Sequence, residues 1–370
     1  MRAGVKSRHG TLFGLFPPRL TLERSPVHLT LLVPELIWPE PNDQLTLGKL
    51  SVPGFEWLAA RARFDRQPKQ AFEIALARQF GLDDMPFGPL RLLGETVGEA
   101  ARDGHWLCAD PVHLRFHHER IVLADAGAFD VDDDEAQALV LALNETFADV
   151  GRFHVATSRR WYLRLNEAVN HPAEPLSTIA GRRIDGELSG KESRLTRWLN
   201  EVQMFLHGHP VNAQRQSAGK PAINSLWLWG GGNLPAPPTA AWSAVSTNNP
   251  LATGLALASG ISAEALPSGL SALLDHAQGD RQLVVLDALL PPVLYEDGEG
   301  WRKAWQAMDR DWFGPLQGAA GRRIETLNIV APTIYGQLNW TLHGLDRWKF
   351  WRKARPLATL AKELAEGNAP

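Results

Sequence analysis

Several features that would define a specialised class of protein are scarce in this sequence. Its 370 residues include one cysteine, Cys108, which excludes an intramolecular disulfide framework and favours a reducing compartment, so we expect a cytoplasmic protein. Because no motif surrounds this thiol, we interpret Cys108 as a buried filler side chain rather than a nucleophile. No run of about 18 apolar residues occurs, so we expect no membrane-spanning helix. Residues 1–27 are predicted to be a flexible extension rather than a signal peptide, because Pro17 and Pro18 interrupt their apolar stretch.

An excess of charge of one sign is also lacking. The 38 Lys and Arg residues are nearly balanced by 41 Asp and Glu residues, which gives a formal net charge of -3. Proteins that bind nucleic acids over an extended surface usually carry a broad positive field. We therefore expect no nucleic-acid partner.

Tyrosine is rare, with three residues, whereas tryptophan is abundant, with fourteen. Large aromatic rings usually fill cores, which is the simplest interpretation of this balance. A different interpretation is an interaction protein that uses a tryptophan-rich surface to bind a partner.

The order of the apolar segments indicates an α/β fold. Hydrophobic residues make up 44% of the chain, enough for a large core divided between two domains. Short apolar strands alternate with helical patterns, which is typical of a mostly parallel sheet covered by helices on both faces. The core strands are predicted at residues 28–34, 242–246, 283–287 and, as the last strand, 326–330; the core helices are predicted at 55–63, 70–80, 250–259 and 300–312.

A different pattern between residues 104 and 172 predicts a small inserted α+β domain. Two strands are predicted at 106–116 and 121–124, and a helix that begins in an acidic turn is predicted at 130–147. Two more strands are predicted at 153–157 and 160–165. The chain is predicted to begin with a flexible extension (1–27), which the first part of the core (28–103) and the insert (104–172) follow. The second part of the core (173–346) and a surface tail (347–370) complete it. The tail is basic and aromatic from Trp348 to Lys353, and we interpret it as a short surface helix, with contact to a membrane or nucleic acid as the alternative.

The stretch from 209 to 232 is the most distinctive in the chain. It reads HPVNAQRQSAGKPAIN and then SLWLWGGG, which we interpret as a polar loop between an amphipathic helix and a buried strand. Its polar side chains predict either an anion or ligand site, or a helix exit and strand entry fixed by hydrogen bonds. The residues concerned are His209, Asn212, Arg215, Lys220 and Asn224.

This stretch resembles the archaeal-type cofactor-independent phosphoglycerate mutases, in which the segment reads approximately H-P-V-N-x-x-R-x-x-x-G-x-x-P-A-N. Three further segments are similar to that family in order and spacing, at residues 109–125, 135–144 and 243–261. The resemblance extends over residues 28–335 and implies an alkaline-phosphatase-superfamily core with an inserted α+β domain. The chain also resembles a proteobacterial branch, often labelled phosphoglycerate mutase or regulator of pathogenicity factors type E.

The resemblance implies a phosphoserine mechanism with two divalent metals, manganese or zinc, but this chain departs from the family at each chemical position. Apolar residues and proline stand where the family carries metal-binding Asp and His, and the segment matched to the nucleophilic serine has neither Ser nor His. Most substrate-binding arginines of the insert are replaced, and Arg115 remains as one anion contact. The departures lie at residues 33–38, 67–73, 125–129, 283–295 and 327–333.

These departures predict a phosphoglycerate-mutase-like protein whose metal and nucleophile site is degenerate. We expect a non-catalytic ligand-binding or regulatory module with no cofactor, whose partner is a small anionic ligand or a protein. The alternative is an active mutase or related phosphotransferase that holds two divalent metals through non-standard ligands such as Glu35, Asp287 and His209.

Overall fold

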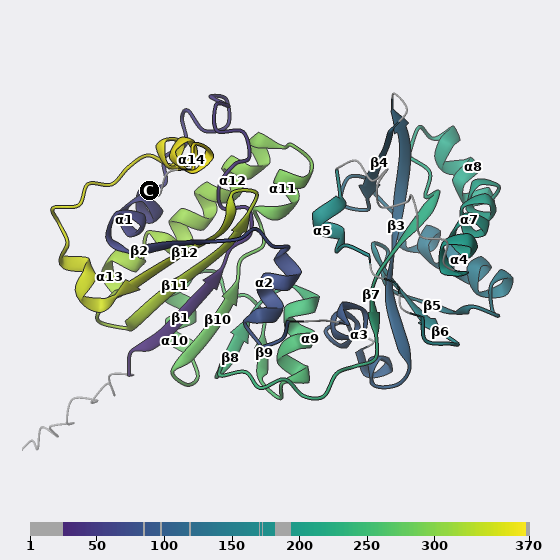
Figure 1. The fold of residues 1–370 in the computed structure, drawn as a ribbon, viewed down its shortest axis with the longest axis horizontal. Coiled ribbons are helices and arrows are strands. Elements are labelled where there is room, and N and C mark those ends of the chain that lie inside the picture. The colour runs from purple at the N-terminus through teal and green to yellow at the C-terminus, as the bar shows by residue number, and fades with distance from the viewer. Residues whose placement is uncertain are drawn as a thin grey trace, which may run out of the picture.

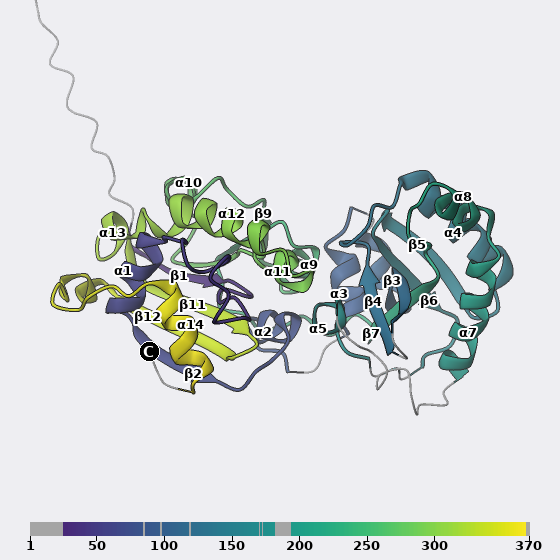
Figure 2. The same cartoon turned by 90° about the horizontal axis from the view of Figure 1, so that it is seen from above.

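The computed structural model describes residues 25–83, 86–96, 98–117, 120–169, 171, 173–181 and 194–367. The predicted extension at 1–27 therefore lies almost entirely outside the described residues. Two lobes stand side by side, each built on one sheet (Figures 1 and 2). None of the helices in the described ranges is both long and apolar enough to cross a membrane.

The first lobe contains a seven-stranded sheet in the order β2-β12-β11-β1-β10-β8-β9. Strand β1 pairs in parallel with β10 and β11, and β8 pairs in parallel with β10 and β9, whereas β12 is antiparallel to β11 and β2. The prediction of a mostly parallel α/β sheet is confirmed. The strands are β1 Val27–Leu32, β2 Arg63–Gln67, β8 Ala244–Ser246, β9 Ser262–Glu264, β10 Arg281–Val285, β11 Ile324–Thr333 and β12 Gly336–His343.

Helices cover both faces of this sheet because successive strand residues point to opposite sides. Leu29 and Leu31 of β1 face one apolar cluster, whereas Leu32 faces the other. The first cluster includes side chains of α1 Pro53–Arg61, α10 Leu270–His276, α12 Gly298–Met308, α13 Leu316–Ala319 and α14 Leu357–Ala365. The second includes side chains of α2 Phe72–Arg78 and α9 Pro250–Ala258. The short helix α11 Leu290–Leu294 and the π-helical turn Asp309–Phe313 complete this lobe.

Several features of this lobe differ from the prediction, including β9 and α10, which were not predicted. Strand β11 is not the last, because the chain turns back as β12, and β2 was not predicted. The segment after residue 347, predicted as a surface tail, ends in α14, which buries Leu357, Leu360 and Leu364 in the core. Ten of the fourteen tryptophans are also buried, so the interpretation of a tryptophan-rich surface holds only for a short segment around Trp348 and Trp351.

The second lobe contains a five-stranded antiparallel sheet in which β3 is central. Its strands are β3 His105–His117, β4 Arg120–Asp125, β5 Gly151–Thr157, β6 Arg160–Leu165 and β7 Ser225–Gly232. Helices α4 Asp133–Thr146 and α7 Arg194–His207 contribute to the apolar cluster of this lobe, and α8 Pro210–Ser217 lies beside α4. Because β7 pairs with β3, the second lobe includes residues that the predicted boundary at 172 assigned to the core.

Helix α3, Phe87–Leu93, lies between the two lobes (Figure 1). On one side Gly88 approaches the backbone of Trp106 and Gly230 in the second sheet so closely that an added Cβ would lie within 3.0 Å of their carbonyl oxygens. On the other side Gly254 of α9 approaches Leu90, where an added Cβ would lie 1.7 Å from the carbonyl oxygen. The lobes are therefore joined by direct backbone packing around α3.

Candidate functional site

The carboxyl ends of the parallel strands β1, β10 and β11 meet at one edge of the first sheet, where ligands of α/β proteins usually bind. A hollow of about 40 Å³ lies there. Its walls come from the loops after β1 and β2, from β11, and from the short helices α5 Leu176–Ile179 and α11. The residues that line it are Pro34, Glu35, Lys69, Gln70, Ala71, Phe72, Ser177, Thr178, Leu290, Pro332 and Thr333.

Two of the predicted alternative metal ligands follow neighbouring strands at this edge. Glu35 lies in the loop after β1 with a left-handed backbone (φ 54°), a conformation that is uncommon for a residue other than glycine. Asp287 follows β10, and its Oδ2 accepts a hydrogen bond of 2.8 Å from Nδ2 of Asn249. Asn249 caps the first turn of α9 through its Oδ1. Asp287 therefore orients a helix cap.

His209, the third alternative ligand, lies in the second lobe. It is the N-cap residue of α8, and its Nδ1 accepts a hydrogen bond of 3.2 Å from the backbone N–H of Val211. Burial lowers the pKa of its imidazole. Within the described ranges, no group of three or more His, Cys, Asp or Glu side chains converges on one point. Because Asp287 orients a helix cap and His209 lies in the other lobe, the three predicted alternative ligands do not form one site for a pair of divalent ions.

A serine and a buried glutamate at the same edge were not predicted. Ser177 in α5 donates a hydrogen bond of 2.6 Å to Oε2 of Glu73 in α2. Burial raises the pKa of the Glu73 carboxyl group. Beside them, the Thr178 hydroxyl is buried and has no hydrogen-bond partner among the described residues. No local sequence motif predicts this pair, because the two residues are 104 positions apart in the chain and only the fold brings them together.

In the 209–232 stretch, the segment predicted as a polar loop begins with helix α8, and its buried polar groups bind other parts of the protein. Asn212 bridges the carbonyl oxygens of Leu206 and Ile223, and Asn224 forms two hydrogen bonds with the backbone of Leu114. Each of these side chains thus joins separate segments of the second lobe. This arrangement accords with the second of the two interpretations, a strand entry fixed by hydrogen bonds.

Arg215 is also engaged inside the protein. Its Nε donates to the carbonyl oxygen of Pro221 at 2.7 Å, and its two terminal nitrogens contact Glu135 and the carbonyl oxygen of Asp130. The guanidinium group also lies over the Phe129 ring. Because Arg215 is buried and three of its donors bind the protein, its guanidinium group is not accessible to an external anion.

Arg115 and Lys220 are the two predicted ligand residues that the structure brings together. Both line an open hollow of about 560 Å³ that also includes Gly181 and Tyr295 from outside the second sheet. Arg115 is exposed, and Lys220 forms an exposed ion pair of 3.2 Å with Asp132. The other residues that line the hollow are His113, Val122, Leu123, Ala124, Ala128, Phe129, Gln216, Gly219 and Pro221.

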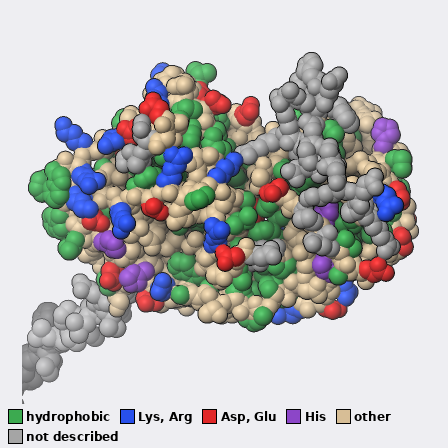
Figure 3. Space-filling view, viewed as in Figure 1, with side chains coloured by type: hydrophobic (Ala, Val, Ile, Leu, Met, Phe, Trp, Pro, Cys, Tyr) green, Lys and Arg blue, Asp and Glu red, His purple; other side chains and the backbone are tan. Residues whose placement is uncertain are grey.

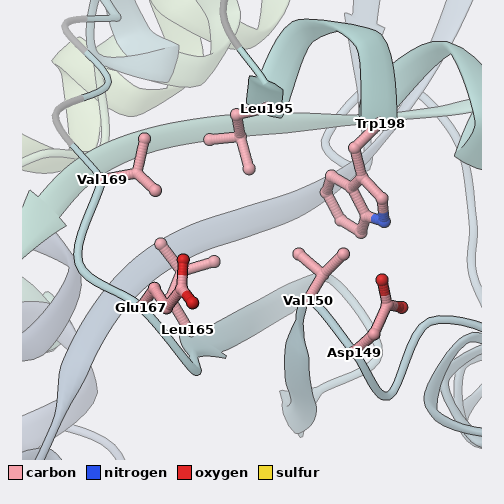
Figure 4. A pocket seen from close by; sticks show the side chains of 7 residues that line it. All are labelled: Asp149, Val150, Leu165, Glu167, Val169, Leu195 and Trp198. Atoms are coloured by element: carbon pink, nitrogen blue, oxygen red, sulfur yellow. The ribbon is translucent and has the colours of Figure 1, made fainter.

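A further hollow of about 40 Å³ lies inside the second lobe (Figure 4). It is lined mainly by apolar side chains, with the Trp198 ring at one end and the carboxylates of Asp149 and Glu167 at its rim. Its volume is close to that of one water molecule, about 30 Å³ in the liquid. It is therefore a shallow depression, far below the roughly 300–1,000 Å³ of small-molecule sites.

Comparison with known proteins gives relatives for part of the chain. No family model matches. The 2,3-bisphosphoglycerate-independent phosphoglycerate mutase of Methanosarcina mazei is 33% identical over 150 residues, which cover 38% of each protein. A second such mutase, from Methanothermobacter thermautotrophicus, is 32% identical over 164 residues, or 42% of this chain and 40% of that protein. The matches thus span about two fifths of the curated relatives' length.

Among solved structures, the PH0037 protein of Pyrococcus horikoshii has a similar fold, with a TM-score of 0.52 and 16% identity over 90% of this chain and 92% of that one. The partial sequence matches confirm the predicted resemblance to the archaeal mutases as a distant relationship. The chain is a distant homologue of the archaeal 2,3-bisphosphoglycerate-independent phosphoglycerate mutases.

Proposed function

We propose that the protein is a phosphoglycerate-mutase-like member of the proteobacterial branch, with a degenerate metal and nucleophile site, that acts in the cytoplasm as a non-catalytic ligand-binding or regulatory module. The observation that carries the proposal is the chemistry of the sheet edge. Its hollow of about 40 Å³ is far smaller than the roughly 300–1,000 Å³ of small-molecule sites. A three-carbon phosphate ester does not fit into that space.

The residues that follow the strands support the same conclusion. The side chains at this edge that lie in the apolar cluster of the first lobe, all at most 2% exposed, are Val33, Leu286, Leu289 and Ala331. Proline at positions 34 and 332 provides no side-chain oxygen or nitrogen at the points where β1 and β11 reach the edge. Apolar packing at these positions leaves few oxygen ligands for a hard divalent cation.

The ligand of this module is a small anion, and its site is the hollow that contains Arg115 and Lys220. The two cations come from β3 and from the turn after α8, and the hollow of about 560 Å³ has the size of a small-molecule site. Arginine is suited to carboxylate and phosphate groups because its planar fork binds two oxygens at once. Phosphoglycerate, with both groups, is the first ligand to test.

The test combines binding, turnover and metal content. Titration of the purified chain with 3-phosphoglycerate, followed by calorimetry, should give binding that weakens roughly tenfold in the double variant Arg115→Gln, Lys220→Gln. The matched control is Arg159→Gln, which removes an exposed arginine of the same lobe and should bind as the unchanged chain does. Conversion to 2-phosphoglycerate together with two equivalents of tightly bound manganese or zinc would overturn the non-catalytic proposal.

One observation favours the alternative of an active phosphotransferase with non-standard ligands. Ser177 is hydrogen-bonded to the buried Glu73, and a hydroxyl beside a carboxylate of raised pKa is the arrangement of a nucleophile with its general base. Lys69 lines the same hollow and would supply positive charge for a phosphate. If phosphatase or mutase activity is found, it should disappear in Ser177→Ala and persist in Thr178→Ala. Activity that persists in Ser177→Ala, or that is lost in both variants, contradicts this role of Ser177.

A further inference from the structure

The segment between β12 and α14 concentrates apolar side chains on the surface. Eight large hydrophobic side chains are strongly exposed among the described residues, and four of them lie within seven consecutive positions. Leu345 is 82% exposed, Trp348 60%, Phe350 79% and Trp351 66%. Three aromatic rings at such exposure are unusual for a protein whose other tryptophans are mostly buried.

The same segment is rich in cations. Arg347, Lys349, Arg352, Lys353 and Arg355 lie within nine positions. Asp346 pairs with Lys349 and Glu363 with Arg355, so these two charges are partly neutralised. For Arg352 and Lys353, no ion pair occurs within the described ranges. The surface, which we call the aromatic-basic segment and define as residues 345–355, therefore carries positive charge although the whole chain is slightly acidic.

A hollow of about 760 Å³ opens beneath this segment. Its rim carries four cations of the segment together with Arg63 of β2, and its floor consists of apolar side chains from α1, β2, β12 and α14. The cations of the rim are Arg63, Lys349, Arg352, Lys353 and Arg355, and the floor includes Phe55, Ala59, Phe64, Trp340, Leu357 and Leu360. An apolar floor below a ring of cations matches a molecule with a phosphate and a hydrocarbon part.

Contacts with the core hold the segment in place. Nη1 of Arg347 donates a hydrogen bond of 2.9 Å to the carbonyl oxygen of Ala320. Nζ of Lys349 lies 3.4 Å from the carbonyl oxygen of Arg61. The segment begins with the 3-10 turn Gly344–Trp348, and the buried helix α14 follows it. In Figure 3, hydrophobic side chains project at the left edge with Lys and Arg beside them, where the yellow chain of Figure 1 leads to α14.

We propose that the aromatic-basic segment is a docking surface for a bilayer that contains acidic phospholipids. Tryptophan favours the interface between lipid headgroups and acyl chains, and lysine and arginine near the surface are attracted to acidic headgroups. Phe350 and Trp351, packed edge to face at 5.4 Å, enter the interface together, while the cations of the rim bind the phosphates. This binding is peripheral and combines two individually weak contributions, apolar insertion and charge.

The charge distribution favours a bilayer over a nucleic acid. A nucleic acid needs cations that follow its backbone across the protein surface, together with open ring faces on which bases stack. Here the cations surround one hollow with an apolar floor, and two of the rings pack against each other. Both features suit a lipid headgroup and its attached chains.

The experiment is co-sedimentation of the full chain with vesicles. We expect binding to an equal mixture of phosphatidylcholine and phosphatidylglycerol, and little binding to phosphatidylcholine alone. The triple variant Trp348→Ser, Phe350→Ser, Trp351→Ser should bind roughly tenfold more weakly because it lacks the apolar insertion. Arg352→Gln with Lys353→Gln should weaken binding and reduce its sensitivity to salt, because added salt screens exposed charges.

The matched control is Leu141→Ser with Met204→Ser, which removes two strongly exposed apolar side chains of the second lobe and should leave vesicle binding unchanged. Circular dichroism establishes that each variant is folded. Equal sedimentation of the triple variant and the unchanged chain would overturn the proposal. Equal binding to both kinds of vesicle would also overturn it, as would binding to an oligonucleotide without binding to vesicles.

Discussion

Arg91 and Asp110 form a bidentate ion pair between α3 and β3, with N–O distances of 2.9 and 2.6 Å. The side chains are only 9% and 2% exposed. Two further hydrogen bonds complete the arrangement: Nε of Arg91 donates to the Tyr162 hydroxyl, and Nε1 of Trp229 donates to Asp110. This pair links the helix between the lobes to the central strand of the second sheet.

Removing one partner of this pair should be strongly destabilising. Asp110→Asn leaves the Arg91 charge buried without its counter-ion, so we expect the free energy of unfolding to fall by about 3–5 kcal/mol. Urea denaturation measures the difference. The control is Glu99→Gln, which removes an exposed pair with Arg102 and should cost less than about 1 kcal/mol. Equal effects of the two substitutions would show that burial does not determine the strength of the Arg91 pair.

The single thiol should be inert in the native protein. Cys108 is completely buried, and burial raises the pKa of its thiol well above the ordinary value, so almost no thiolate forms near neutral pH. We expect Ellman's reagent to label no thiol in the native chain and one per chain in strong denaturant. Rapid labelling without denaturant would contradict this burial.

Stability should depend on pH through Asp125. Burial raises the pKa of this carboxyl group to about 6 in the folded protein, compared with about 4 in the unfolded chain. Between these values only the folded state retains the proton, so stability is lost as the pH rises through 6. The free energy of unfolding of Asp125→Asn, relative to that of the unchanged chain, should therefore rise by about 2 kcal/mol between pH 4 and pH 7.5. The exposed substitution Asp83→Asn serves as the control, and a constant difference for Asp125→Asn contradicts the prediction.

The contact between α3 and α9 should not tolerate a methyl group. In Gly254→Ala the new Cβ would lie 1.7 Å from the Leu90 carbonyl oxygen, so the helices must separate, at a cost of about 1–3 kcal/mol or more. Gly318→Ala is the matched control, because a Cβ added there would meet no atom within 4 Å, and it should be neutral or stabilise the protein by up to about 1 kcal/mol. Thermal unfolding compares the two variants. An unchanged melting temperature for Gly254→Ala would contradict this close approach.

Local patterns predicted those elements whose signals lie within a short stretch of sequence. The strands β1, β10 and β11 are short apolar runs, and the acidic turn before α4 is a capping box formed by Asp132 and Glu135. Helix α8 was missed although His209 followed by a proline is a helix-start signal, because its polar sequence resembles a loop. Strand β12 was missed although its alternating polar and apolar residues are a strand signal, whereas its pairing with β2 and β11 depends on distant segments.

Contacts between segments that are far apart in the chain could not be predicted from local sequence patterns. The pairing of β7 with β3 joins strands more than a hundred positions apart, and nothing in the apolar run of β7 distinguishes one sheet from the other. The Ser177–Glu73 pair and the hollow around Arg115 depend in the same way on how distant segments pack. Conversely, Asn212 and Arg215 have the residue types of a ligand site, but their partners are backbone and side-chain atoms of their own lobe.

The pairing of Trp106 with Gly232 places the entrance and exit of the second lobe next to each other. A segment whose two ends meet in this way can be gained or lost as one block while the surrounding sheet keeps its connections. Linking residue 104 directly to residue 233 with a few glycines should thus give a shortened chain in which the seven-stranded sheet still forms. The excised block is an unbroken stretch that contains all five strands of its own sheet.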